Sequence, residues 1–163
     1  MNRRKINKPK LNLNDLKKQQ IIKNTFNNSD FDLYIDNSGI PKAGFGVFTN
    51  DFIPAECIIG LYEGEKIFDY DYTNDPYYYE IRALDREKGI SSFGISAQKY
   101  PRCFMGMIND ATDDPEFKNN CEFEVEIDEE DITKSKIYIV SIVDIEEGEE
   151  LFVSYGSDYW VNK

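Results

Sequence analysis

From residue 31 onward the chain is a succession of short runs rich in β-branched and aromatic residues, each bounded by glycine, proline, asparagine or aspartate. Such runs are typical of short β-strands. They do not alternate with long helical repeats, as strands of parallel α/β sheets do, so the pattern favours a mainly β domain of antiparallel strands. We expect strands at residues 31–35, 46–49, 57–62, 77–84, 92–95, 121–127, 137–141 and 151–154.

Helical signals are few. Residues 1–30 carry a weak helical pattern among many Lys, Asn and Gln, which predicts a basic N-terminal tail or weak helix before a domain at residues 31–163. Within that domain, residues 100–109 are the one plausible short helix. Strand composition alone suits a sandwich, a barrel or a rolled sheet equally, so it does not decide the architecture.

Residues 121–127 give the clearest strand pattern. Apolar and acidic side chains alternate along it, as in a strand with one buried face. The apolar face would carry Cys121, Phe123, Val125 and Ile127, and the opposite face Glu122, Glu124 and Glu126. We expect the row of carboxylates to face solvent or a basic partner.

The composition excludes several kinds of site. The 163 residues are 40% apolar, enough for the core of one domain of ordinary size. The chain contains no histidine, which excludes Ser-His-Asp and Cys-His nucleophiles and His-liganded zinc or haem. Three scattered cysteines, Cys57, Cys103 and Cys121, are too few for a zinc cluster or a disulfide framework. We therefore expect no metal site, and free thiols in an intracellular protein.

Charge is unevenly distributed along the chain. Residues 1–24 contain eight basic side chains and one acidic one, a net +7, and because the whole chain is −12 the remainder is −19. Such an acidic body repels nucleic acid and attracts a basic partner, although acidity also serves solubility. No apolar run reaches the length of a membrane span, and the polar N-terminus does not resemble a signal peptide. We expect a soluble intracellular protein that does not contact membranes.

Three glycine-containing segments stand out, at residues 43–48, 62–65 and 148–156. Taken separately, each has an ordinary explanation. Gly44 and Gly46 would shape a turn between strands, the second segment would end a strand, and the third would be a solvated Glu-rich hairpin loop before a half-buried tyrosine. Their order along the chain carries more information than any one of them.

In chain order, a Gly-x-Gly turn, a strand ending in Tyr-x-Gly, an Ile-Asn segment and a Gly-Glu-Glu-Leu run into Tyr-Gly resemble the SET-domain protein lysine methyltransferases. The middle segment, Met107-Ile108-Asn109-Asp110 and then Asn119-Asn120-Cys121, is similar to the family's Arg-Phe-Ile-Asn-His and Asn-Cys segments. The resemblance covers residues 31–160. It implies the SET-domain fold, which is mainly β, with short antiparallel strands in small sheets, a C-terminal pseudoknot and few short helices.

The sequence departs from the family pattern at three positions. Asp110 stands where the family usually has His, Gly106 where it usually has Arg, and Ser154 where Asp commonly precedes the tyrosine. The loop 111–118 is longer and more acidic than usual, and the chain contains no cysteine-rich zinc motif of the kind that follows the domain in many members. These departures bear on the two ends of the cofactor site more than on the fold.

The resemblance implies S-adenosylmethionine as the cofactor, Tyr155 as the catalytic tyrosine and Asn120 as a structural residue of the pseudoknot. Asp110 would contact adenine mainly through its backbone. Val153 stands where the family usually has Phe or Tyr, and the number of methyl groups added stays open. The implied cofactor-binding residues are Gly44, Phe45, Gly46, Tyr62, Asn109, Asp110 and Tyr155, and the implied substrate-binding residues are Tyr79, Val153, Tyr159 and Trp160.

The implied reaction transfers a methyl group to the neutral ε-amine of a peptidyl lysine. The pKa of a free lysine is about 10.4, so the amine must first lose its proton, which desolvation in a narrow aromatic channel favours. This chemistry needs no histidine base. A groove rimmed by the acidic residues of the segment 122–131 would attract a basic protein, with a histone tail as the favoured substrate and the nucleus as the favoured location.

Two alternatives from other classes stay open. A non-catalytic SET-like module would bind a basic peptide or partner protein, and the departures at Gly106, Asp110 and Ser154 favour it. A nucleic-acid-binding protein would use residues 1–24, and its binding would fall steeply with salt. The acidity of the rest of the chain disfavours direct nucleic-acid contact outside residues 1–24. The sequence also permits a homodimer without requiring one.

Overall fold

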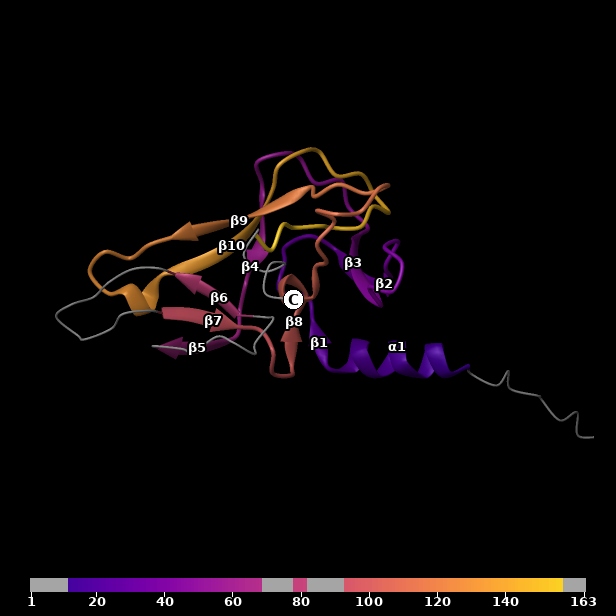
Figure 1. Cartoon of the computed structure of the whole chain (residues 1–163), viewed down its shortest axis with the longest axis horizontal. Coiled ribbons are helices and arrows are strands. Elements are labelled where there is room, and N and C mark those ends of the chain that lie inside the picture. The colour runs from indigo at the N-terminus through magenta and orange to yellow at the C-terminus, as the bar shows by residue number, and fades with distance from the viewer. Residues whose placement is uncertain (1–11, 69–77, 82–92, 157–163) are drawn as a thin grey trace, which may run out of the picture.

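The computed structural model describes residues 12–68, 78–81 and 93–156, which form small sheets around a shared apolar core (Figure 1). One sheet contains, in spatial order, β4 (Ile58–Leu61), β10 (Lys136–Ser141) and β9 (Cys121–Glu126), and a second contains β5 (Glu65–Phe68), β7 (Phe93–Ser96) and β6 (Tyr78–Ile81). Two-stranded sheets pair β2 (Leu33–Asn37) with β3 (Phe45–Thr49) and β1 (Thr25–Phe26) with β8 (Arg102–Cys103). The helices are α1 (Leu13–Lys23) and the 3₁₀ turns η1 (Phe104–Met107) and η2 (Ile132–Lys134).

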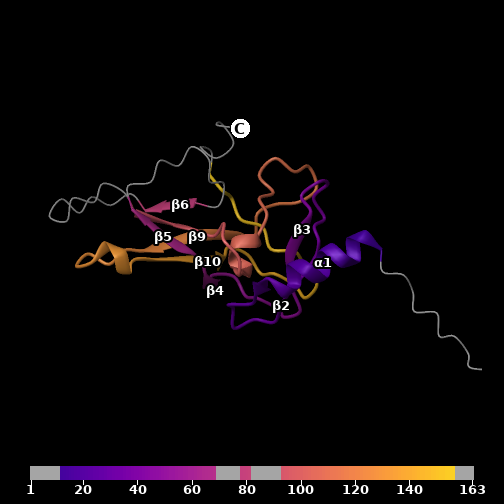
Figure 2. The ribbon, with the colours of Figure 1, turned by 90° about the horizontal axis from the view of Figure 1, so that it is seen from below.

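This arrangement confirms the predicted fold class. The named strands pair antiparallel except for β1 and β8, which are parallel. Figures 1 and 2 show the sheet β5-β7-β6 lying beside β9 and β10 at one end of the molecule, with β2, β3 and α1 at the other. The turn η1 contacts β3, and its Met105 also lies against Gly60 of β4, in the sheet with β9 and β10, so residues next to η1 can contact both ends.

Most predicted strands are observed with ends shifted by one or two residues. The prediction for residues 77–84 is observed as β6, and the rest of that range lies outside the described residues. The prediction of a strand at 151–154 is wrong, because Phe152 bridges to Asn109 and the next residue bridges to a different segment, at Cys121. The extended chain there passes between two segments instead of running along one partner.

The helix predicted at residues 100–109 is much shorter than expected. Arg102 and Cys103 form β8 and pair with β1, so helical structure is confined to the 3₁₀ turn η1. The sequence pattern also does not predict β5, whose four residues include two charged side chains. Both differences come from pairing with segments distant in sequence, which override weak local preferences.

The C-terminal segment crosses two earlier segments and forms the pseudoknot. The backbone N–H of Cys121 donates to the carbonyl of Phe152 at 2.9 Å. The side-chain amide of Asn120 donates to the carbonyl of Glu150 at 2.8 Å, and its Oδ1 accepts from the N–H of Phe152 at 2.8 Å. These bonds confirm that Asn120 is a structural residue. We call this region the chain crossing, defined as residues 108–110, 119–121 and 150–155.

Alternate residues of the strands build the core. Ile137 and Ile139 of β10 are fully buried. In β9, Cys121 is buried while the glutamates are exposed, which confirms the predicted alternation within the strand. Ile127 is an exception, because it lies beyond the end of β9 and is 52% exposed.

Helix α1 lies against the body without burying any of its residues. The side chain of Asn12 caps its first turn. An ion pair between Lys18 and Asp36, with an N–O distance of 2.7 Å, joins the helix to β2. After the helix, the carbonyl of Asn24 accepts from the backbone N–H of Arg102 at 3.0 Å. None of the helices in the described ranges has the length and apolar character needed to cross a membrane. The domain boundary near residue 30 stays a prediction.

Candidate functional site

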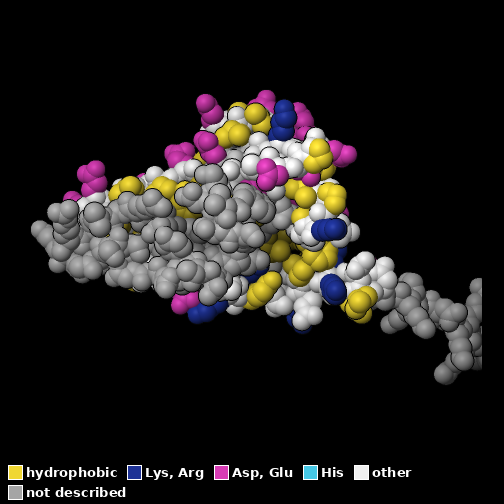
Figure 3. All heavy atoms as spheres, in the orientation of Figure 1, with side chains coloured by type: hydrophobic (Ala, Val, Ile, Leu, Met, Phe, Trp, Pro, Cys, Tyr) yellow, Lys and Arg dark blue, Asp and Glu magenta, His cyan; other side chains and the backbone are white. Residues whose placement is uncertain are grey.

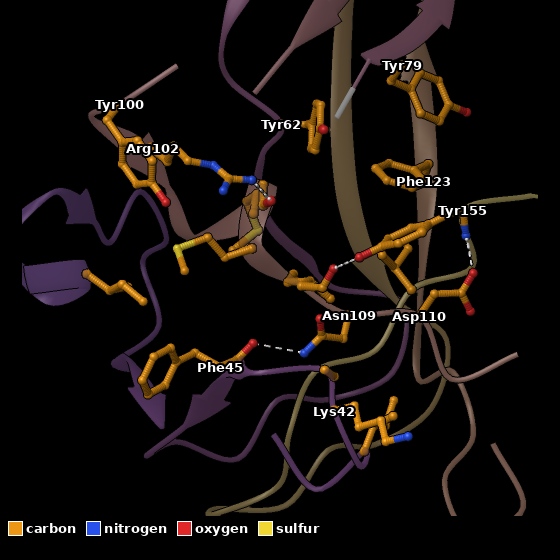
Figure 4. A pocket seen from close by; sticks show the side chains of 18 of the residues that line it. Lys42, Phe45, Tyr62, Tyr79, Tyr100, Arg102, Asn109, Asp110, Phe123 and Tyr155 are labelled. Carbon is orange, nitrogen blue, oxygen red and sulfur yellow. Dashed lines mark hydrogen bonds between the residues drawn. The ribbon is translucent and has the colours of Figure 1, made fainter. Parts of the chain in front are cut away.

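A pocket of about 520 Å³ lies where η1 meets the loop before β3 and the aromatic side chains of β6 and β9 (Figure 4). Its volume is within the range of small-molecule sites. Figure 3 shows apolar side chains gathered beside α1, while acidic side chains are spread around the upper rim of the molecule. The lining residues are Ile21, Ile40, Pro41, Lys42, Ala43, Phe45, Tyr62, Tyr79, Tyr100, Arg102, Met105, Gly106, Met107, Ile108, Asn109, Asp110, Phe123, Val153 and Tyr155.

Three rings form one side of the pocket, and we call Tyr62, Tyr79 and Phe123 the aromatic wall. The ring of Phe123 packs edge-on against Tyr62 at a centroid distance of 5.6 Å and lies 4.5 Å from Tyr79. Burial raises the pKa of the Tyr79 phenol, so this hydroxyl stays protonated at neutral pH. The wall is therefore uncharged and mostly apolar. It brings together two residues that the sequence analysis assigned to the site, Tyr62 and Tyr79.

Tyr155 enters the pocket from the C-terminal side of the chain crossing. Its hydroxyl donates to the backbone carbonyl of Ile108 at 2.6 Å, and its backbone N–H donates to Asp110 Oδ2 at 2.8 Å (Figure 4). Val153, two residues earlier, is buried and also lines the pocket. Because the hydroxyl proton is directed to a carbonyl, the lone pairs of the phenol oxygen are what a cationic ligand in the pocket would meet.

Asn109 connects the chain crossing to the loop before β3. Its side-chain amide nitrogen donates to the carbonyl of Phe45 at 3.0 Å and to Glu150 Oε1 at 3.2 Å, while its backbone carbonyl accepts from the N–H of Val153 at 2.9 Å. No described residue donates to Asn109 Oδ1. A ligand contact from this side chain would therefore use the amide oxygen, which suits a donor such as an ammonium group.

Glu150 is a buried residue with a structural role that the sequence analysis did not identify. The prediction of a solvated Glu-rich loop is wrong at this position, since Glu150 is only 6% exposed. Its Oε2 accepts from the backbone N–H of Gly39 at 2.8 Å. A Cβ at Gly46 would collide with the Glu150 carboxylate, so the missing side chain there makes room for Glu150. Gly44 differs, because its φ of +78° requires glycine while the space beside it is open.

The side chain of Asp110 makes several hydrogen bonds, in addition to any contact that its backbone would make with a ligand. Its Oδ1 accepts from the backbone N–H of Thr112 at 2.7 Å and the hydroxyl of the same residue at 2.5 Å, and it also lies 3.3 Å from Asn119 Nδ2. Its Oδ2 accepts from the backbone of Tyr155. The carboxylate therefore joins the loop after residue 110 to the segment that carries Tyr155.

The expected acidic groove is not this pocket. Phe123 faces the pocket, so the glutamates on either side of it in β9 point to the opposite face of the strand. Asp110 is the one acidic residue among the described lining residues, which include two cations, Lys42 and Arg102. The sequence offers no signal for Arg102, which is only 7% exposed. Tyr159 and Trp160 lie outside the described residues.

Comparisons with known proteins agree with this geometry. The family model of the SET domain matches residues 44–156. A search of curated proteins finds no match. A structure of ctPRC2 in an autoinhibited conformation bound to S-adenosylmethionine is similar over 77% of this chain at 22% identity, with a TM-score of 0.55. This chain spans only 15% of that protein chain.

A second solved structure is that of a Plasmodium falciparum protein named as a candidate histone methyltransferase. It matches 80% of this chain and 98% of its own at 17% identity, with a TM-score of 0.56. At such identities the two likenesses show the fold. The family match over residues 44–156, joined to the crossing that Asn120 holds in place, shows that the chain belongs to the SET-domain family.

Proposed function

We propose that this protein is an S-adenosylmethionine-dependent protein lysine N-methyltransferase. The observation that carries the proposal is the meeting of Tyr155, Asn109 and the aromatic wall in one pocket of a SET-domain fold. The similar ctPRC2 structure is bound to S-adenosylmethionine, and the similar Plasmodium protein is named as a candidate histone methyltransferase. Both names support the same reaction class.

The pocket residues fit this cofactor. Asn109 Oδ1 suits the ammonium of the amino-acid portion. Gly44 does not line the pocket itself but lies between two lining residues, Ala43 and Phe45, and the space beside it is open. Phe45 and Tyr62 line the same pocket and offer apolar contact. Gly46 does not line the pocket, and what the structure shows of it is that its missing side chain makes room for Glu150. When bound, S-adenosylmethionine would supply an electrophilic methyl group.

The aromatic wall would prepare the substrate amine. Tyr79 and Phe123 offer no charge to stabilise an ammonium group fully removed from water, so desolvation lowers the pKa of the entering lysine and the proton leaves to water. The phenol oxygen of Tyr155 would align the neutral amine and stabilise positive charge that develops on it. Val153 bounds this space with a small side chain.

A basic protein is the proposed substrate, with a histone favoured, and a nuclear location would follow from that choice. The acidity of the chain outside residues 1–24 supports a basic partner. The printed name of the Plasmodium structure supports a histone. The proposed catalytic domain is residues 31–163, in which Tyr159 and Trp160 stay predicted substrate-binding residues. A homodimer also stays a prediction.

The first test is transfer of a labelled methyl group from S-adenosylmethionine to core histones and other basic proteins. Tyr155→Phe should lower transfer by about 100-fold or more, because it removes a positioned polar group at the reacting atoms. Cofactor affinity measured by calorimetry should change little. Tyr34→Phe is the matched control, since Tyr34 is a half-buried tyrosine stacked on Phe48 away from the pocket.

The same experiment distinguishes the proposed methyltransferase from the second candidate function, a non-catalytic SET-like module that binds a basic peptide or partner protein. The departures at Gly106, Asp110 and Ser154 favour that candidate. Cofactor binding without transfer to any protein in the panel would leave the cofactor site standing and contradict the proposed substrates. Absence of both cofactor binding and transfer would favour the non-catalytic module. Equal loss of transfer in Tyr155→Phe and Tyr34→Phe would contradict the role of Tyr155.

A further inference from the structure

The pocket contains a buried positive charge that the proposed function has not used. Arg102 is 7% exposed and lines the pocket, although the chain as a whole is strongly acidic. The other lining cation, Lys42, is exposed. A guanidinium does not lose its proton in proteins, so Arg102 brings a permanent charge into the site. Burying such a charge is costly unless the surroundings provide acceptors.

The guanidinium is held in a defined position. One Nη donates to the backbone carbonyl of Gly106 at 2.9 Å, and the group lies 5.4 Å from the centre of the Tyr100 ring. The backbone of Arg102 is fixed by its pairing with Thr25 and by the bond from its N–H to Asn24. Figure 4 shows Arg102 beside Tyr100 on the side of the pocket opposite Asp110. Arg102 and Asp110 therefore lie on opposite sides of the pocket.

The packing around Gly106 leaves the guanidinium of Arg102 as the buried positive charge in this part of the pocket. The family pattern usually has Arg at this place in the chain, but a Cβ here would lie 2.7 Å from the Cβ of Ala97, so the packing leaves no room for a side chain. The side chain of Arg102, four residues earlier, bonds to the backbone carbonyl of Gly106. Arg102 thus brings a guanidinium to a site where the sequence has glycine.

We propose that Arg102 binds the carboxylate of the cofactor's amino-acid portion. This inference rests on the proposed function, since it assumes that S-adenosylmethionine is the ligand. That ligand has one anionic group, its carboxylate, and a guanidinium recognises carboxylates through two parallel N–H donors. Asn109 Oδ1 would receive the adjacent ammonium. The amino-acid end of the cofactor would therefore lie between Arg102 of β8 and Asn109, which follows η1.

The test compares S-adenosylmethionine with its decarboxylated analogue by calorimetry on the full chain. The native protein should bind S-adenosylmethionine about 10- to 100-fold more tightly, the range expected for a charge-assisted hydrogen bond pair. Arg102→Met should abolish this preference by weakening only the carboxylate-containing ligand. Arg102→Lys should retain part of it, because it keeps the charge but not the planar fork.

Two controls test whether a change in ligand preference is specific to Arg102. Lys99→Met removes an exposed positive charge three residues away, one paired with Glu65, and should keep the full preference. Binding of 5′-methylthioadenosine, which has no amino-acid portion, should be the same in the native chain and Arg102→Met, which shows that the pocket is intact. The preference of the native chain is itself a test that needs no variant.

The outcomes are distinct. Equal binding of both ligands by the native chain would overturn the inference and leave the proposed function intact. A preference that survives in Arg102→Met but disappears in Lys42→Met would also overturn it, by moving the carboxylate to the exposed lysine. If the native chain binds neither ligand, the proposed cofactor fails and the inference fails with it. Loss of the preference only in the Arg102 variants supports it.

Discussion

The two sides of the pocket are held by different interactions. On one side, the chain crossing joins side-chain amides and carboxylates to the backbone, as Asn120 does with Glu150 and Phe152. On the other, the aromatic wall is held by ring packing, with Phe123 touching both tyrosines. Hydrogen bonds to buried backbone groups admit few substitutes, whereas apolar packing tolerates changes of shape. The crossing should therefore decide whether the pocket forms, and the wall should decide what enters it.

The largest expected effect comes from breaking the crossing. Asn120→Ala would leave the N–H of Phe152 and the carbonyl of Glu150 without their partners in a buried region. Each of these two losses costs about 1–3 kcal/mol, so the free energy of unfolding should fall by roughly 2–6 kcal/mol. Urea denaturation measures this change, and calorimetry should show weakened cofactor binding at the same time.

Asn50→Ala is the matched control for this substitution. Asn50 is exposed and its side chain bonds only to the Asp32 carboxylate at 3.3 Å, so the change should be within about 0.5 kcal/mol. If Asn120→Ala were no more destabilising than Asn50→Ala, the crossing would not be the element that holds the pocket together, and the contrast between the two sides would disappear.

A smaller effect on stability, with a clearer effect on substrate, is expected from the aromatic wall. Phe123→Leu removes the ring contacts with Tyr62 and Tyr79, which costs about 1–3 kcal/mol because each of the two aromatic pairs contributes roughly 0.5–1.5 kcal/mol. We expect KM for a basic protein substrate to rise while cofactor affinity stays within a few-fold. Steady-state methyl transfer and calorimetry measure the two quantities.

Phe48→Leu provides the comparison, because Phe48 is also half-buried and stacks on one tyrosine, Tyr34, at 5.5 Å. With one aromatic pair it should lose about 0.5–1.5 kcal/mol of stability and show no change in KM. A rise in KM in both variants would mean that the wall acts on substrate only through general stability. Loss of cofactor affinity in Phe123→Leu would show that the wall belongs to the cofactor side of the pocket.

The contrast between the two sides also explains which features the sequence could predict. The alternation of β9 is local, so the exposed glutamates and the inward-facing Phe123 follow from residues next to one another. The role of Asn120 came from a family pattern. Nothing local marks Glu150 as buried, because one of its donors is the backbone of Gly39, 111 residues away in sequence. The same holds for Arg102, whose burial depends on pairing with β1.

The strand predicted at residues 151–154 fails for the same physical reason. Its composition suits a strand, but Phe152 and Val153 bridge to different segments, so no single partner runs along it. A period-2 pattern records which face of a segment is buried and does not record how many partners share it. Features of the crossing are therefore the least predictable from local sequence.

Alkaline pH gives the smallest effect and separates the two sides without removing a large group. Burial raises the pKa of the Cys121 thiol, in the crossing, from 9.0 to about 12. Between these values the unfolded chain loses the thiol proton while the folded chain retains it, so stability is complete below pH 9 and falls as the pH rises, by about 1.4 kcal/mol per pH unit. Tyr79, in the wall, has an ordinary pKa of 10.0 that burial also raises, so its contribution begins only above pH 10.

Urea denaturation at pH 8, 9 and 10 therefore separates the buried thiols from Tyr79, and the Cys121→Ala variant isolates the part that belongs to the crossing. Cys121→Ala should reduce the fall in the free energy of unfolding over this range, while Tyr79→Phe should leave it unchanged. Cys103, whose pKa burial also raises, should account for part of the remaining fall, and Cys57→Ala serves as the control thiol outside the crossing. An equal fall in the native chain and Cys121→Ala would mean that the crossing opens to solvent and lets the thiol ionise. In that case the crossing would not be the more rigid side of the pocket.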